Sequence, residues 1–372
     1  MKKQICLWFI ILVLNAMVFG QASRKMQNRN PGDLDISSMV QPIPMKNKFM
    51  DEKYNIYCGS VTKGDNGPYY MFYSRWPFSD YHHAWPFNSE IALAKADKPE
   101  GPFTHVKVVL PPRGAAFWDG SATHNPNIMR YKGKYYLYYM GTSATSILQR
   151  PIPMSDKNWW DYRNSQRIGV AVAEDPEGEW ERFDKPVLDV SSDPLAPDAL
   201  MVSNPAATFK VKGEIILVYK QVSKGETYKG GKVTYGVAFA KSPVGPFKKE
   251  TKRIFELKEG NDTWMVAEDP YIWFQDKTYF VIVRDVVGRF TGQSGAWALL
   301  LSENGKEWSP AKYPKVIKAL PEWEDGSLCT GILGRPCLLI ENGSPRFLYA
   351  AYTIEEQGRR SCNIAIPLKA VK

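Results

Sequence analysis

The stretch that decides the fold runs from Trp118 to Thr142 and reads WDGSATHNPNIMRYKGKYYLYYMGT. It contains a short apolar segment at Asn127–Tyr131, a turn at Lys132-Gly133 and a longer aromatic segment at Tyr135–Met140. Aromatic and branched residues favour the pleated, half-buried surface of a strand, so the two segments predict a β-hairpin. The polar residues that precede the first strand give this hairpin an entrance suited to functional side chains.

The hairpin pattern recurs along the chain, which indicates a repeat architecture. The other four copies, of which the first is degenerate, begin at Cys58, Ser203, Glu268 and Gly334. Most hairpins are followed by a strand of alternating small and larger residues and by a Pro-x-Gly-Pro-Phe turn or a variant of it. Each unit therefore contains three strands, a turn and a fourth strand. Such units, repeated roughly every 65 to 80 residues, are typical of propeller blades. The sequence therefore predicts an all-β, five-bladed β-propeller with four-stranded antiparallel blades.

The repeats predict a single domain over residues 21–372, because closed all-β architectures often exceed the average domain length. The last repeat contains three strands instead of four. A ring with an unpaired strand edge invites mispairing, so we expect residues 35–50 to supply the missing strand and close the circle.

The first 20 residues have the layout of a secretory signal peptide. Lys2 and Lys3 precede an apolar run from Ile5 to Phe19, and small residues follow. We expect export to the periplasm or the extracellular space.

Four cysteines remain after cleavage, and the sequence leaves open whether they form disulfides or are buried thiols: Cys58, Cys329, Cys337 and Cys362. Their spacing does not match a zinc site, and no metal or other cofactor is predicted.

The chain is basic, with 48 Lys and Arg against 39 Asp and Glu and a net charge of +9. This balance is compatible with an acidic or sulfated carbohydrate as the partner, although solvated lysines on the blade edges explain it equally well. Export and the lack of a long basic run argue against nucleic acid, and the apolar run is too short to span a membrane. The sequence does not indicate an oligomeric state.

Propeller geometry collects the candidate catalytic residues at one mouth of the ring, where loops carry function. Hydrolysis of a glycosidic bond needs one carboxyl group to protonate the leaving oxygen and another to activate water. Glu268 is the predicted general acid, because crowding beside Asp269 and Trp264 is expected to raise its pKa. Asp269 is an equal candidate for the working group, and capping of a backbone turn is the alternative role for Glu268. The candidates for the base, or for a carboxylate that tunes the acid, are Asp51, Asp119 and Asp198. For the latter two a turn-forming role is the alternative.

The same mouth is expected to hold the residues that bind the substrate. Aromatic faces mixed with hydrogen-bonding groups suit a sugar ring, and cations suit a carboxylate or sulfate on it. The predicted substrate-binding residues are Arg75, Trp76, His82, His83, Trp85, His124, Asn125, Asn204, Lys220, Asp269, Asp285 and Arg335. Packing in a lid or an ordinary structural ion pair is the alternative for the aromatic and the basic members.

These features resemble the five-bladed propeller glycoside hydrolases of families 43, 62 and 117 over residues 50–372. The resemblance implies inverting hydrolysis with a base from blade one, a tuning Asp from blade three and an acid Glu from blade four. Glu268 in Ala267-Glu268-Asp269-Pro270 matches the Glu-Gly-Pro of the fourth blade. Cys58-Gly59 and Asn204-Pro205 stand where family 43 has Asp-Pro, so those two acids lie elsewhere or are missing. On this point the chain resembles family 117 more, which has its own arrangement and a His that assists the acid.

Two functions follow from the sequence. The first is an exported glycoside hydrolase that acts on an oligo- or polysaccharide with Glu268 as general acid. The second is a non-catalytic carbohydrate-binding propeller that has lost its base. The missing Asp-Pro pairs favour the second, and the cluster of His, Trp and carboxylates favours the first.

Overall fold

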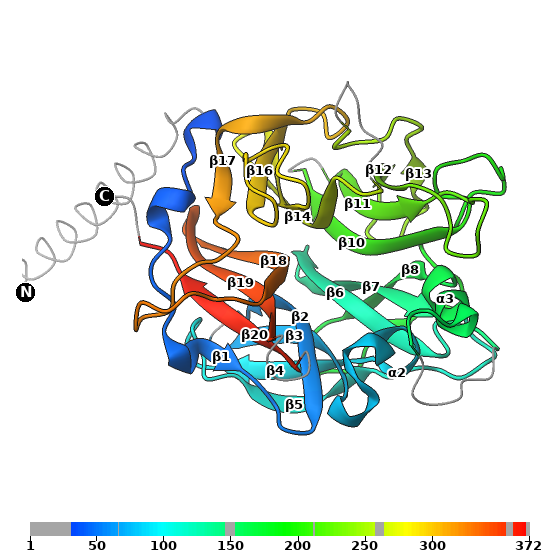
Figure 1. Ribbon diagram of the computed structural model, residues 1–372, viewed down its shortest axis with the longest axis horizontal. Helices are drawn as coiled ribbons and strands as arrows, with labels where there is room; N and C mark the ends of the chain where they lie inside the picture. The colour runs from blue at the N-terminus through cyan, green and yellow to red at the C-terminus, as the bar shows by residue number, and fades with distance from the viewer. Residues whose placement is uncertain are drawn as a thin grey trace, which may run out of the picture.

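The computed structural model describes residues 31–65, 67–145, 153–210, 213–256, 264–354 and 360–369. Within these residues the chain forms five four-stranded antiparallel sheets. The sheets stand around a central axis, and the chain runs once round the ring from blade to blade (Figure 1). The predicted five-bladed propeller is confirmed. The proposed signal peptide lies outside the described residues.

Each of the first four blades uses four consecutive strands. Blade one contains β2 (Tyr54–Lys63), β3 (Tyr69–Pro77), β4 (Glu90–Ala96) and β5 (Thr104–Leu110). Blade two contains β6 (Ala122–Tyr131), β7 (Lys134–Thr142), β8 (Arg167–Ala173) and β9 (Glu181–Arg182). Blade three contains β10 (Met201–Phe209), β11 (Ile215–Val222), β12 (Val233–Ala240) and β13 (Lys248–Lys249). Blade four contains β14 (Ala267–Gln275), β15 (Thr278–Asp285), β16 (Trp297–Ser302) and β17 (Ser309–Ile317).

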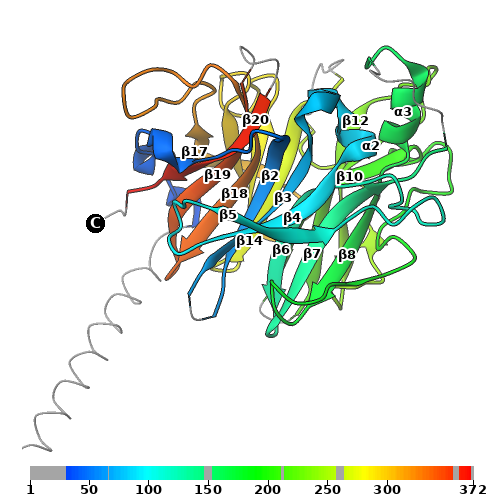
Figure 2. The same ribbon diagram turned by 90° about the horizontal axis from the view of Figure 1, so that it is seen from below.

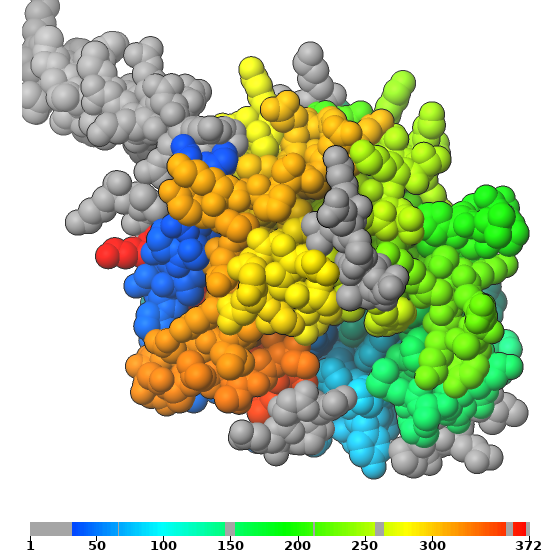
Figure 3. All heavy atoms as spheres, turned by 45° about the horizontal axis from the view of Figure 1, so that its top comes forward, coloured from blue at the N-terminus to red at the C-terminus, as the bar shows by residue number. Residues whose placement is uncertain are grey.

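Blade five takes its outer strand from the other end of the chain. Its strands are β18 (Ile332–Glu341), β19 (Ser344–Ile354), β20 (Arg360–Pro367) and β1 (Lys48–Phe49). The blue N-terminal segment, which includes 3₁₀ turns at Pro31–Asp33, Ser37–Met39 and Met45–Asn47, packs against the orange segments of blades four and five (Figure 3). Pairing of β1 with β20 covers the edge that a three-stranded last blade would expose.

The apolar core is distributed between the blades. In the described part of the chain, the five largest clusters of buried apolar side chains each lie between two neighbouring sheets. Phe72 of blade one, for example, shares a cluster with Leu137 of blade two, and both are fully buried. No sheet therefore has a core of its own, and the stability of each blade depends on a complete ring.

Two inserts cover one mouth of the ring. The first, after β3, contains 3₁₀ turns at Phe78–Asp80 and His82–Ala84 and the short helix α2 (Trp85–Asn88). The second, after β7, contains α3 (Lys157–Asn164), which begins where the Asp156 carboxylate accepts the backbone N–H of Asn158 at 2.8 Å. The two helices share an aromatic cluster and lie at the same end of the blades (Figure 2).

The four cysteines in the described residues are free and buried. No helix among these residues has the length and apolar character needed to cross a membrane.

The closure of the ring predicts that a substitution near the N-terminus weakens the whole fold. Ile43 has no exposed surface, and its backbone pairs with Trp323 in the segment between β17 and β18. Ile43→Ala should lower the free energy of unfolding by about 2–4 kcal/mol, because it leaves a cavity in a shared core. Met45→Ala is the control. Because Met45 is 42% exposed, this substitution should change the free energy of unfolding by less than about 0.5 kcal/mol. Equal effects of the two variants in denaturant titrations would contradict the closure.

Candidate active site

The innermost strand of every blade carries a bulge at the axis. At each bulge one non-glycine residue adopts a positive φ, and the pairing with the next strand shifts register at the same point. These five hub residues are Cys58, Asn125, Asn204, Asp269 and Arg335, with φ between 47° and 57°. Positive φ is uncommon for residues with a Cβ, so its recurrence in all five blades marks a shared structural requirement.

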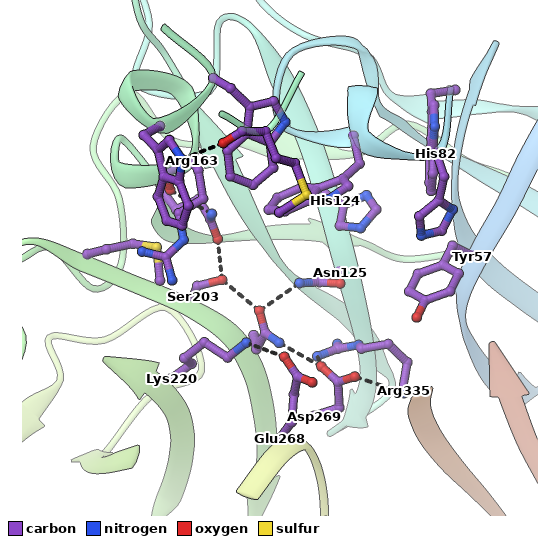
Figure 4. A pocket seen from close by; sticks show the side chains of 18 of the residues that line it. Tyr57, His82, His124, Asn125, Arg163, Ser203, Lys220, Glu268, Asp269 and Arg335 are labelled. Atoms are coloured by element: carbon purple, nitrogen blue, oxygen red, sulfur yellow. Dashed lines mark hydrogen bonds and ion pairs between the residues drawn. The ribbon is translucent and has the colours of Figure 1, made fainter. Parts of the chain in front are cut away.

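The hub residues form a chain of hydrogen bonds that links the blades in order. Figure 4 shows the part of this chain that includes Asn125, Asp269 and Arg335. Cys58 Sγ donates to Asn125 Oδ1 at 2.8 Å, and Asn125 Nδ2 donates to Asn204 Oδ1 at 2.8 Å. Asn204 Nδ2 donates to Asp269 Oδ1 at 2.7 Å, and Asp269 Oδ2 accepts the backbone N–H of Arg335 at 3.1 Å. Burial raises the pKa of the Cys58 thiol, so the thiol keeps its proton and acts as the donor.

A pocket of about 280 Å³ opens above this floor. Every blade contributes to its lining, together with the two inserts. Ten of the residues singled out in the sequence line it: Trp76, His82, Trp85, His124, Asn125, Asn204, Lys220, Glu268, Asp269 and Arg335. Trp264, expected from the sequence to crowd Glu268, also lines it. The lining residues that the sequence did not single out are Tyr57, Met154, Trp159, Trp160, Arg163, Gln166, Met201 and Ser203.

Glu268 lies on the pocket wall between two cations. Its Oε1 is 2.8 Å from Lys220 Nζ, and its Oε2 is 3.0 Å from Arg284 NH1. Burial alone raises the pKa of Glu268, but Lys220 and Arg284 outweigh it and hold the pKa below its ordinary value. The expected rise of this pKa is therefore wrong for the protein without substrate. Lys220 comes from the neighbouring blade, so the sign of the shift depends on a contact between blades.

His124 forms the aromatic side of the pocket. Its ring lies 5.2 Å from that of Trp85 at an interplanar angle of 26°, and 6.4 Å from that of Tyr57 at 13°. Ser89 Oγ is 2.8 Å from His124 Nδ1 and fixes the orientation of the ring. Burial lowers the pKa of His124 well below its usual range, so the imidazole is neutral. The pocket thus offers a flat face of stacked rings without a charge on it.

Helix α3 adds a cation to the opposite side. The Arg163 side chain is 6% exposed, its guanidinium lies 5.3 Å from the centre of the Trp160 ring, and its NH1 donates to Asn164 Oδ1 at 2.9 Å. Burial lowers the pKa of Arg163 to about 10, a shift that the charge of Glu268 opposes. The guanidinium therefore stays protonated at neutral pH.

The structure places all three candidate bases, Asp51, Asp119 and Asp198, outside the pocket. Asp119 is fully buried, and its carboxylate contacts Arg113 Nε at 2.7 Å, the Tyr139 hydroxyl at 2.7 Å and the guanidinium of Arg182. The expectation that it joins Glu268 at the mouth fails, because these partners hold it among the outer parts of blade two. Its geometry is that of a structural ion pair.

Asp198 and Asp51 also lie away from the pocket. The Asp198 carboxylate forms an ion pair with Lys249 on the outermost strand of blade three. Asp51 accepts the backbone N–H of Lys53 at 2.8 Å, which is a turn-forming role. A catalytic role for either residue stays a prediction that its position does not favour.

Three predicted substrate-binding residues are absent from the lining as well. Arg75 pairs with a carboxylate on β4 and stacks on Tyr54, with its guanidinium 4.3 Å from the ring centre. The backbone carbonyl of His83 accepts the indole N–H of Trp159. Asp285 accepts backbone N–H groups of residues 289–291 and thereby anchors the loop after β15. Each has a structural role next to the pocket.

The fold and this axial pocket define a five-bladed propeller with the architecture of glycoside hydrolases. No protein-family model and no curated protein matches the sequence. Among solved structures, the chain resembles a glycoside hydrolase (14% identity, TM-score 0.63, covering 90% of this chain and 92% of that one). It also resembles Zg3597, a family 117 glycoside hydrolase of the marine bacterium Zobellia galactanivorans (15%, 0.60, 89% and 90%). A thermostable family-43 glycoside hydrolase is similar too (11%, 0.58, 90% and 93%). At these identities the likeness shows the fold.

The hub predicts a large effect of Asn125→Ala on stability. The substitution leaves the Cys58 thiol without its acceptor and removes one of the two donors to Asn204 Oδ1, so we expect a loss of about 2–4 kcal/mol in the free energy of unfolding. Asn342→Ala is a matched control, because Asn342 shares the positive φ but is exposed in a turn. Both variants lose the preference of Asn for this conformation, so their difference in chemical denaturation reports the hub hydrogen bonds. A difference near zero would contradict a stabilising hub.

Proposed function

We propose that the protein is a glycoside hydrolase that removes a sugar unit from the end of an oligo- or polysaccharide. The observation that carries the proposal is a glutamate, Glu268, on the wall of an axial pocket in a fold shared with glycoside hydrolases. Hydrolysis of a glycosidic bond requires a carboxyl group beside the leaving oxygen. Glu268 is the residue in this pocket best suited to that role.

The shape and chemistry of the pocket support a sugar as the ligand. A volume of about 280 Å³ holds one sugar ring rather than a long chain, which favours action at a chain end. The stacked rings of Tyr57, His124 and Trp85 present a face for the apolar side of a sugar. The amides of Asn125 and Asn204 in the floor present polar groups for its hydroxyls.

In the proposed mechanism Glu268 is the general acid. Beside Lys220 and Arg284 it is ionised near neutral pH, and a general acid must carry a proton. We therefore propose that Glu268 takes up its proton when the substrate binds. A substrate that excludes water from Glu268, or that takes Lys220 as its own partner, raises the pKa of the carboxyl group. The proton then passes to the glycosidic oxygen as the bond to the leaving sugar breaks.

Asp269 is our candidate for the base. Among the lining residues that the structure describes, Glu268 and Asp269 are the two carboxylates. Family 43 resembles this chain in its hub sequence but has Asp in blades one and three, where Cys58 and Asn204 stand here. The hub carboxylate of this chain is instead in blade four. Asp269 would activate water for attack on the face opposite Glu268, which gives inversion at the anomeric carbon.

The proposal predicts that Glu268→Gln abolishes turnover while it spares binding. Glutamine keeps the size of the side chain but cannot transfer the proton, so kcat should fall by about 10²–10⁴-fold with little change in Kd. Product release from an oligosaccharide panel gives kcat, calorimetry gives Kd, and NMR gives the anomeric configuration of the product. Asp269→Asn should lose activity as well.

Asp198→Asn serves as the control, because Asp198 pairs with Lys249 outside the pocket. It should retain the wild-type kcat. A Glu268→Gln variant with wild-type turnover would remove Glu268 from the mechanism.

One observation favours a second function, carbohydrate binding without hydrolysis. Both carboxylates of the pocket are engaged by cations, Glu268 by Lys220 and Arg284, and Asp269 by Arg335 at 3.6 Å. Saturable binding of a glycan with no product from any member of the panel would select this function.

We also propose that residues 1–20 direct export. The supporting observation is their sequence, with two lysines before an apolar run. N-terminal sequencing of protein recovered from the periplasm or medium should begin just after residue 20. An uncleaved protein in the cytoplasmic fraction would contradict export.

A further inference from the structure

Among the lining residues that the structure describes, the three cations Arg163, Lys220 and Arg335 outnumber the two carboxylates. Lys220 and Arg284 pair with Glu268, and Arg335 pairs with Asp269. Arg163 lines the same pocket, and no carboxylate of the described residues lies within ion-pair distance of its guanidinium.

Arg163 differs in this respect from the other well-buried arginines. Arg113 and Arg182 both pair with Asp119, and Arg75 pairs with Glu90. A buried guanidinium is costly unless an anion compensates it. The negative charge of Glu268 acts on Arg163 and favours its protonated form. The two carboxylate oxygens of Glu268, however, accept hydrogen bonds from Lys220 and Arg284.

Contacts hold the Arg163 side chain in place, but they do not use all of its hydrogen-bond donors. It stacks on Trp160, and NH1 donates to Asn164, but Nε and NH2 have no hydrogen-bond acceptor among the described residues. Arg163 belongs to α3 and is 94% buried, and in the pocket it lies on the far side of Ser203 from Asn125 (Figure 4). A planar donor pair, pre-oriented by an aromatic ring, is left facing the pocket, and this geometry matches the two oxygens of a carboxylate or a sulfate ester.

We propose that Arg163 binds an anionic group on the sugar in the pocket, so that the substrates are acidic glycans that carry a uronate or a sulfate ester. The inference rests on the proposed carbohydrate pocket and adds the class of sugar that the pocket selects. The anion supplies the compensating charge that the protein does not provide. Arg163 acts in specificity, and the proton transfers remain with Glu268 and Asp269.

Matched pairs of oligosaccharides test the proposal. One set pairs uronate-containing oligosaccharides with their carboxyl-reduced forms, and the other pairs sulfated oligosaccharides with their desulfated forms. Calorimetry on the wild-type protein should give a Kd about tenfold or more lower for the anionic member of at least one set. Which set shows the difference distinguishes a uronate from a sulfate.

Arg163→Met should abolish that preference while it leaves the Kd of the neutral member nearly unchanged, because Met keeps apolar contact with Trp160. Arg163→Lys should keep part of the preference, since the charge remains but the planar donor pair is lost. Arg346→Met is the control, because Arg346 is exposed on blade five, and it should behave as wild type. Thermal unfolding verifies that α3 and the blades stay folded in each variant.

Equal Kd values within every pair, or an Arg163→Met variant that retains the preference, would overturn the inference. Hydrolysis of neutral glycans with no dependence on Arg163 would leave the proposed hydrolase standing and remove only the anion site. Arg163-dependent binding of acidic glycans without any product would support the anion site and remove the proposed hydrolase activity.

Discussion

The structure depends on the chain of hydrogen bonds between five hub residues at the axis. Each blade enters the axis with a residue in the left-handed conformation, which turns its side chain toward the neighbouring blade. Without β-bulges at these points the inner strands would run past the axis with their regular alternation of faces. The hub thus fixes the relative position of the blades and also forms the floor of the pocket. The same side chains therefore hold the blades together and form part of the proposed binding surface.

Most of the fold could be predicted from the sequence because its signals are local and repeated. Hairpins such as the one at 127–140 depend on alternating aromatic residues and a turn, and both are visible in the printed chain. The hub positions could be located too, since four of them directly precede a proline. Glu268 and His124 lie in the pocket because each directly precedes a hub residue on the same strand.

The parts of the site that sequence could not give depend on contacts between distant segments. Asp119 also precedes an inner strand, but Arg113 and Arg182 hold it elsewhere. The sign of the pKa shift of Glu268 is set by Lys220, which lies in another blade. Arg163 lies in an insert, and its importance comes from the lack of a carboxylate partner among the described residues, which no local pattern encodes.

The electrostatics of the pocket set this chain apart from a neutral sugar site. Its carboxylates pair with cations. Arg163, which has no carboxylate partner among the described residues, lines the space where a sugar would bind. A crystal structure of the Glu268→Gln variant with an acidic oligosaccharide is the decisive measurement. We predict a sugar ring against His124, its anion on Arg163, and a glycosidic oxygen within about 3 Å of residue 268. A glycan bound on the rim or the opposite face of the propeller, with the axial pocket untouched, would contradict this prediction.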